Sequence, residues 1–83
     1  MTLTLTLYGR AGCHLCDDMR AQLYPLEQRY GFSVESIDIG GDSDLGARYG
    51  LKIPVLTAGA EEICHYTLDA DALIRYLNDH NAN

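Results

Sequence analysis

Two cysteines separated by two residues, Cys13 and Cys16, constrain the fold of this chain more than any other feature. They follow an alternating Thr/Leu segment, residues 2–8, that predicts a β-strand, and they open an amphipathic segment that predicts a helix. Cysteines three apart at a helix start lie one turn apart, so their sulfurs can meet in a disulfide. The first thiol also lies among unpaired helix N–H groups, which favour its thiolate. Together these features predict a thiol–disulfide redox centre.

The length and charge of the chain exclude several classes of protein. Its 83 residues allow one domain with one modest core. The 12 acidic against 6 basic residues give a formal net charge of −6, which disfavours nucleic acids and anionic membranes as partners. Because the sequence contains no apolar run of about 18 residues and its first residues lack a basic and an apolar region, we expect neither a membrane span nor a secretory signal. With 3 cysteines, an odd number, we expect reactive thiols and a cytoplasmic location rather than a disulfide scaffold.

Apolar periodicity and turn residues predict an α/β domain with the element order β-α-β-α-β-β-α. We expect one domain over residues 1–78 and a frayed tail over 79–83. The expected strands are 2–8, 32–39, 53–57 and 62–66, and the expected helices are 13–30, 43–49 and a last one that begins near residue 70. A helical crossover makes the first two strands parallel, and a short turn makes the last two an antiparallel hairpin. The result is a four-stranded mixed sheet flanked by helices.

Local residues refine the expected helices. Pro25 should kink the first helix or end its regular part near Tyr24. Ser43 is the expected N-cap of the second helix, and either Thr67 or Asp69 is the expected N-cap of the third. In the second strand, the apolar pattern changes phase between 34 and 37, which predicts either a bulge or burial on both faces.

Two segments resemble the glutaredoxin branch of the thioredoxin superfamily. Residues 7–16, Leu-Tyr-Gly-Arg-Ala-Gly-Cys-His-Leu-Cys, are similar to the active-site loop of a small bacterial glutaredoxin-like family. Residues 49–56, Tyr-Gly-Leu-Lys-Ile-Pro-Val-Leu, are similar to that superfamily's second signature, in which a cis-proline lies against the cysteines. The resemblance covers essentially the whole chain. It implies a thioredoxin-like fold and dithiol exchange with protein or low-molecular-weight disulfides.

The resemblance also implies roles at the cysteines. Cys13 is the expected nucleophile, and Cys16, deeper in the helix, is the expected resolving thiol. His14 either tunes the pKa of Cys13 or is an exposed loop residue without a role. Arg10 either adds to that tuning and pairs with a substrate carboxylate, or pairs with Asp17. The carboxylates that follow Cys16 oppose the thiolate, although solvent screens them.

The second signature implies a docking surface. A cis bond before Pro54 would leave the Ile53 backbone free to pair with an extended substrate, a form of strand addition. Ile53 and Val55 are expected to flank that surface. The alternative is a trans-proline at a strand edge.

Glutathione is the expected candidate co-substrate, and we expect no bound cofactor. Arg10, Arg48 and Lys52 are candidate partners for its carboxylates. Many glutaredoxins carry Gly-Gly after the last strand, whereas residues 65–69 here read His-Tyr-Thr-Leu-Asp. Pro-Tyr between the cysteines is likewise replaced by His-Leu. We therefore expect weak glutathione use by a protein that acts as a monomer.

Other functions remain open at the level of sequence. The Cys-x-x-Cys motifs of two chains could together bind a metal or an iron–sulfur cluster, since one motif supplies half of a four-ligand set. A thioredoxin-fold module that only binds a partner is a further alternative. Cys64, in the last expected strand, is either a buried small hydrophobe or a third redox thiol. His65 and His80 are expected at the surface.

Overall fold

The computed structural model describes residues 3–80 and contains a four-stranded mixed sheet and three helices. The strands are β1 (Thr4–Gly9), β2 (Ser33–Asp38), β3 (Val55–Ala58) and β4 (Glu61–His65), and the helices are α1 (His14–Tyr30), α2 (Ser43–Tyr49) and α3 (Ala70–His80). The predicted order β-α-β-α-β-β-α and the α/β fold class are therefore confirmed. Among the described residues, no helix is long and apolar enough to cross a membrane.

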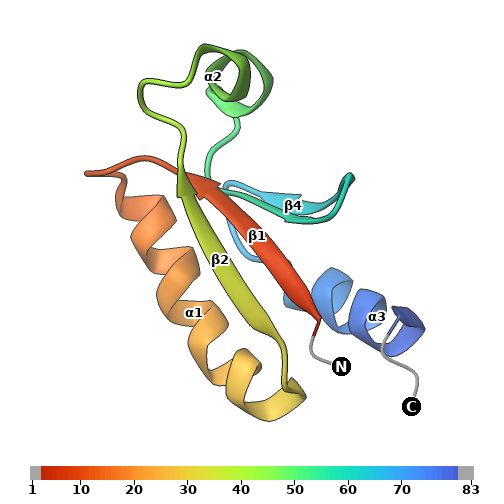
Figure 1. The fold of residues 1–83 in the computed structure, drawn as a ribbon. Helices are drawn as coiled ribbons and strands as arrows, with labels where there is room; N and C mark the ends of the chain where they lie inside the picture. Colours follow the sequence, from red (N-terminus) through yellow and green to blue (C-terminus); the bar gives the residue numbers. More distant parts are fainter. Residues whose placement is uncertain (1–2, 81–83) are drawn as a thin grey trace.

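The strands lie in the order β2-β1-β3-β4, with β1 in the interior of the sheet (Figure 1). β1 pairs with β2 in parallel and with β3 in antiparallel orientation, and β3 and β4 form an antiparallel hairpin. Because β1 is interior, the loop that follows it begins at the centre of one end of the sheet. That loop carries the two cysteines.

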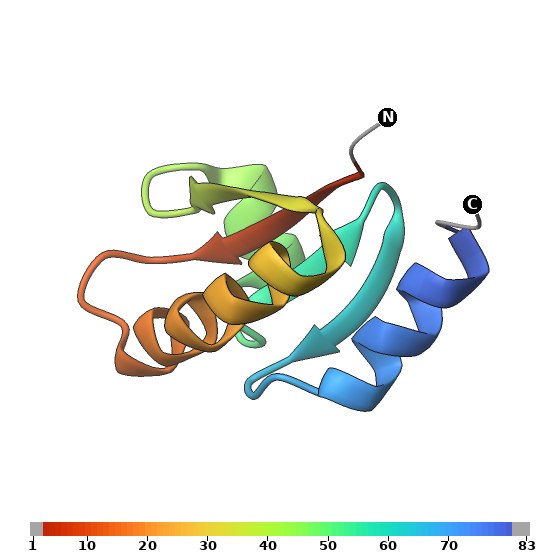
Figure 2. The same cartoon turned by 90° about the horizontal axis from the view of Figure 1, so that it is seen from below.

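Helices cover the two faces of the sheet unequally. α1 and α3 lie on one face, and the short α2 lies on the other (Figures 1 and 2). Period-two alternation in β1 sends Leu5 and Leu7 toward α1 and α3, and sends Thr6 and Tyr8 to the other face. On that second face, the ring of Tyr8 stacks on that of Tyr49 at 4.3 Å between centroids, which ties α2 to the sheet.

The hydrophobic core lies between the sheet and the pair α1 and α3. Its fully buried members come from every layer, and they are Leu5, Met19, Leu23, Leu56 and Leu73. Each such side chain contributes about 1.5–3 kcal/mol through burial. This one-sided core fixes α1 on the sheet, and α1 carries the cysteines at its first turn.

α1 continues through Pro25 to Tyr30, so the prediction that its regular part ends near Tyr24 is wrong. Pro25 lacks an N–H, which leaves the carbonyl of Ala21 without its helical partner. Ala21, Tyr24 and Pro25 are all exposed, so water can bond to that carbonyl. Packing of the opposite side of the helix against the sheet then keeps it continuous through the proline position, until Gly31 ends it with a φ of 74°.

The expected bulge in the second strand is wrong, and its expected burial on both faces is only partial. β2 pairs with β1 in unbroken register from Ser33 to Asp38. It is an edge strand in which four of the six residues are exposed. Val34 and Ile37 are both half-buried because they pack on opposite faces of that edge. The change of phase in the apolar pattern therefore marks an edge strand that is partly buried on each face.

Helix ends differ in two places from the expectations. Asp42, not Ser43, is the N-cap of α2, and its carboxylate accepts the backbone N–H of Leu45 at 3.0 Å. Of the two alternatives for α3, Asp69 accepts the N–H of Ala72. α3 then continues to His80, two residues into the expected tail, and residues 81–83 lie outside the described part of the chain.

Candidate active site

A tight turn carries the chain from β1 to α1. The Cys13 N–H donates to the carbonyl of Arg10 at 3.3 Å, and Gly12 has a φ of 79°. A bond from the fourth residue to the first, with positive φ at the third, is the geometry of a type II turn, which favours glycine at that position. Gly12 thus lets the chain reverse and begin a helix at the first cysteine.

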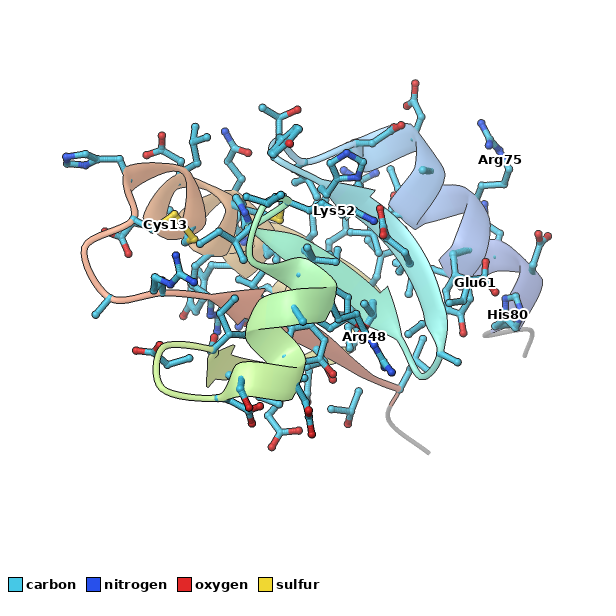
Figure 3. The ribbon with its side chains drawn as sticks, turned by 90° about the horizontal axis from the view of Figure 1, so that it is seen from above. Cys13, Arg48, Lys52, Glu61, Arg75 and His80 are labelled. Atoms are coloured by element: carbon cyan, nitrogen blue, oxygen red, sulfur yellow. A yellow bond between two sulfur atoms is a disulfide. The ribbon has the colours of Figure 1, made fainter. Side chains whose placement is uncertain are left out.

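Cys13 and Cys16 form a disulfide, with 5.2 Å between their Cα atoms (Figure 3). Cys13 is the N-cap of α1, and its sulfur accepts the backbone N–H of Cys16 at 3.1 Å. A helix N-terminus and an N–H donor both favour negative charge on sulfur. In the reduced state this position therefore stabilises a thiolate on Cys13.

The two sulfur-bearing side chains differ in exposure. Cys13 is half-buried, whereas Cys16 is 7% exposed and faces β1. Gly9, at the end of β1, makes that packing possible, because a Cβ on Gly9 would lie 3.0 Å from the Cys16 Sγ. Sequence reasoning missed this role of Gly9, since the contact joins the end of β1 to the first turn of α1.

A cavity of about 220 Å³ lies beside Cys16 and is lined by Arg10, Asp17 and Asp38 among others. Arg10 forms no ion pair with Asp17 within residues 3–80. Its side chain instead extends toward α2, where the guanidinium Nη2 lies 3.6 Å from the Cβ position of Gly50. His14 is the first residue of α1 and is exposed, so it lies next to Cys13 in the chain and in contact with solvent.

The peptide bond between Ile53 and Pro54 is cis. Pro54 is buried and its carbonyl accepts the N–H of Tyr66 at 2.9 Å. In the described part of the chain, neither the N–H nor the C=O of Ile53 forms a backbone hydrogen bond. Val55 is fully buried and pairs with Tyr8 on one side and β4 on the other. The expectation that Val55 flanks a substrate surface is therefore wrong, because the sheet covers its side chain and occupies its backbone.

Two of the three cations expected to bind carboxylates, Lys52 and Arg48, lie away from the disulfide. Lys52 forms an ion pair with Glu62 of β4, and the other Glu62 oxygen lies 2.6 Å from Nδ1 of His65. The hydrogen bond from Lys52 lowers the pKa of Glu62 below its ordinary 4.5, partial burial opposes this, and the bond with His65 adds to it. Arg48 lies on the side of α2 turned away from Cys13 (Figure 3).

Tyr66 is a second site residue that sequence reasoning missed. Besides its N–H bond to Pro54, its hydroxyl donates to the carbonyl of Leu51 at 2.7 Å. It also lines a small cavity with Leu15, which lies between the two cysteines. The one available signal was the replacement of Gly-Gly by bulky residues after β4. Leu51 itself is 91% exposed, so an apolar side chain projects beside this loop.

The third cysteine is separate from the disulfide. Cys64 lies in β4 with its side chain in the core, and burial raises the pKa of its thiol. This environment is that of a small hydrophobe rather than an attacking thiol. Within residues 3–80, no group of three or more His, Cys, Asp or Glu side chains is arranged to hold a metal ion. His65 and His80 are exposed.

Solved structures of other proteins share this fold. A protein from Nitrosomonas europaea, known from solution NMR, is 40% identical and superposes with a TM-score of 0.83 over 92% of both chains. An X-ray structure of a protein from X. campestris is 36% identical with a TM-score of 0.69, over 90% of this chain and 96% of that one. Thioredoxin 1 from Thermosipho africanus, 16% identical with a TM-score of 0.63 over 95% of this chain and 99% of that one, shares the fold.

Sequence comparison identifies the family. An uncharacterized protein from Mycobacterium tuberculosis is 31% identical over 72 residues, which are 81% of this chain and 74% of that protein. The family described as "Glutaredoxin-like domain (DUF836)" matches residues 4–78, which include both cysteines and the cis-proline. The chain therefore belongs to this glutaredoxin-like family, and its fold is that of thioredoxin.

Proposed function

We propose that this protein is a thiol–disulfide oxidoreductase that works by dithiol exchange through Cys13 and Cys16. The observation that carries the proposal is the difference between the paired cysteines. Cys13 is half-buried at the helix N-cap with an N–H donor on its sulfur, and Cys16 is buried against β1. One thiol is thus suited to attack an incoming disulfide, and the other is suited to act afterwards within the protein.

The reaction begins with both thiols reduced. The Cys13 thiolate attacks one sulfur of the substrate disulfide, forms a mixed disulfide and releases the other substrate sulfur, which takes a proton from solvent. Cys16 then loses its proton and attacks the Cys13 sulfur, which releases the second substrate thiol. The substrate gains two electrons and two protons, and the protein is left with the Cys13–Cys16 disulfide. An external thiol, glutathione or a dithiol protein, must supply two electrons to reduce it again.

The Ile53 backbone is the proposed docking point for the substrate. Its N–H and C=O lack backbone partners in the described chain, and the neighbouring Pro54 lies at the end of the sheet from which the cysteine loop departs. An extended segment that pairs with Ile53 would present its own disulfide to Cys13. Pro54 has no N–H to donate, so an added strand would pair with the backbone of one residue here, Ile53.

Polypeptide disulfides are the proposed substrates, and glutathione is proposed as a weak reductant. Lys52 is engaged by Glu62 and Arg48 points away from Cys13, so two of the three expected carboxylate partners are placed elsewhere. We also propose that the protein acts as a monomer in the cytoplasm, where a reducing environment regenerates the dithiol.

Trapping of intermediates tests this proposal. With a peptide disulfide as substrate, Cys16→Ser should accumulate a mixed disulfide at Cys13, because no resolving thiol remains, and Cys13→Ser should abolish exchange. Peptide mapping by mass spectrometry identifies the linked residue. Cys64→Ala is the matched control and should turn over like the wild type. A mixed disulfide trapped at Cys16 in the Cys13→Ser variant would reverse the assigned roles. Stoichiometric zinc on the purified wild-type protein, with no turnover, would reject the proposal.

A further inference from the structure

Tyr66 holds a backbone conformation that needs an explanation. Its φ of 66° is positive, and within residues 3–80 the other positive φ angles all belong to glycines. A bulky residue in this region costs about 1–3 kcal/mol and persists only where surrounding contacts impose it, which happens most often at functional sites. Here the contacts are the bonds of its N–H to the Pro54 carbonyl and of its hydroxyl to the Leu51 carbonyl. Both ends of Tyr66 therefore brace the segment 51–54.

Tyr66 also lines a cavity over the first turns of α1, the helix that begins at the disulfide. The cavity has a volume of about 80 Å³ and lies between α1 and the segment 66–68, with Leu15, Met19 and Leu68 supplying apolar surface. A water needs about 10–15 Å³ measured in this way, so the space admits a short aliphatic side chain. Leu15, 47% exposed, and Tyr66, 48% exposed, form its rim. Leu15 lies in the same first turn of α1 as the disulfide, so a substrate whose own disulfide meets Cys13 can place a neighbouring side chain in this cavity.

Charge restricts the occupant further. Asp18 lines the cavity, Asp17 precedes it on the exposed first turns of α1, and no basic side chain lines the cavity. The whole chain carries a formal net charge of −6. An acidic ligand would lie in a field of like charge, whereas a neutral or basic segment is attracted. An apolar side chain flanked by neutral or basic residues fits both the walls and the charge.

We propose that Tyr66 is the specificity-determining residue of the disulfide exchange, and that the cavity it forms with Leu15 binds an apolar side chain next to the substrate cysteine. The inference rests on the proposed function. The Tyr66 ring selects the side chain, and the Tyr66 hydroxyl positions the segment 51–54 through the Leu51 carbonyl. The substrate class is thus a polypeptide disulfide with an aliphatic residue beside its cysteine and no acidic neighbour.

Steady-state kinetics with matched substrates test the inference. Three peptide disulfides should differ only in the residue beside the cysteine, Leu, Glu or Lys, and bis(2-hydroxyethyl) disulfide serves as a probe without a side chain. We expect wild-type kcat/KM for the Leu peptide to exceed that for the Glu peptide by about tenfold or more, the size of effect that one apolar contact gives. Tyr66→Gly loses both ring and hydroxyl, so KM should rise for all three peptides and most for the Leu peptide, which removes most of this ratio. The loss of kcat/KM should be much smaller for the small probe, which has no side chain to bind in the cavity, than for the Leu peptide.

Two more variants separate the roles of ring and hydroxyl. Tyr66→Phe keeps the ring and loses the bond to Leu51, so KM should rise for all three peptides while the Leu-to-Glu ratio is retained. Tyr24→Ala removes an exposed tyrosine elsewhere on α1 and should leave the ratio unchanged. Glycine tolerates the positive φ, and thermal unfolding verifies that Tyr66→Gly is folded. A wild-type ratio in folded Tyr66→Gly would overturn the inference while leaving the proposed function intact. Failure of the wild type to reduce any of the four disulfides would instead overturn the proposed function.

Discussion

Gly9 has a role that depends on the side chain it lacks. It ends β1, and its Cα faces the Cys16 sulfur so closely that a Cβ would approach within 3.0 Å of Sγ and 3.2 Å of the Cys16 Cβ. Few real Cβ atoms lie so close to another heavy atom. Both neighbouring atoms belong to Cys16, which is buried in the first turn of α1. The Cys16 sulfur can therefore lie where it does only because Gly9 of β1 carries a hydrogen atom in place of a side chain.

Gly9→Ala should destabilise the protein by about 1–3 kcal/mol, because the added methyl overpacks the contact with Cys16. It should also lengthen the lifetime of the mixed disulfide on Cys13, since a displaced Cys16 attacks more slowly. Urea unfolding gives the first quantity, and acid-quenched mass spectrometry gives the second.

Gly46→Ala is the matched control for this substitution. Gly46 lies inside α2, and nothing lies within 4 Å of its Cβ position. Alanine there should stabilise the protein by about 0.5–1 kcal/mol through its helix propensity, without an effect on exchange. If Gly9→Ala resolved substrate as fast as Gly46→Ala, the contact between Gly9 and Cys16 would not control the reaction.

At the scale of elements, ionic contacts join the segment before Pro54 to β4. Glu62 accepts from Lys52 with one oxygen and lies beside His65 with the other. The pKa of Glu62 is lowered, chiefly by the Lys52 hydrogen bond, so its carboxylate is favoured by folding. The stabilisation is fully present above the ordinary pKa of 4.5 and is lost as the pH falls through the lowered value.

Glu62→Gln should therefore reduce the loss of stability between pH 6 and about pH 3, because glutamine does not take up a proton in that range. Urea midpoints measured across the range give the slope for each protein. Glu61→Gln is the control, since Glu61 is an exposed neighbour with no ion pair in the described chain. Equal slopes in the Glu62→Gln variant and the wild type would contradict the assignment.

Sequence patterns predicted the elements well and their details poorly. Apolar periods set the type and order of each element, because every helix and strand must bury one face. The errors at Pro25, Ser43 and the second strand arose where solvent, an adjacent residue or a neighbouring strand decides the local structure. Water accommodates Pro25, Asp42 competes with Ser43 for the cap, and the edge position of β2 explains its pattern.

The candidate site shows the same division. The spacing of Cys13 and Cys16 was enough to predict their pairing, since both lie in one helical turn. Tyr66 and Gly9 act across separate elements, and a single sequence carries no signal for such contacts. The direction of Arg48 and the pairing of Lys52 likewise depend on how α2 and β4 pack, so their predicted role did not follow from charge alone.

At the scale of the whole molecule, one core on one face of the sheet supplies most of the stability. A chain of this length has a free energy of unfolding of about 4–12 kcal/mol at 0.05–0.15 kcal/mol per residue. Leu23 of α1 is fully buried in that core.

Leu23→Ala should lower the free energy of unfolding by about 2–5 kcal/mol, through lost burial and a residual cavity, and so consume a large part of the total. Tyr24→Ala, one residue along and exposed, should change it by about 0.5 kcal/mol or less. Urea unfolding of both variants makes the comparison. Similar losses in the two would show that α1 does not pack on the sheet as described.

The unequal exposure of Cys13 and Cys16 also fixes the order in which the two cysteines act in the proposed exchange. In the proposed exchange, every encounter with a partner begins at the same atom, the Cys13 sulfur, because Cys16 is covered by β1. The partner then stays covalently attached for as long as the buried thiol needs to reach outward. That dwell time is governed by the packing of α1 against β1 and much less by the identity of the partner. Slow and fast substrates of this protein should therefore differ in how often they are captured, and much less in how long they are held.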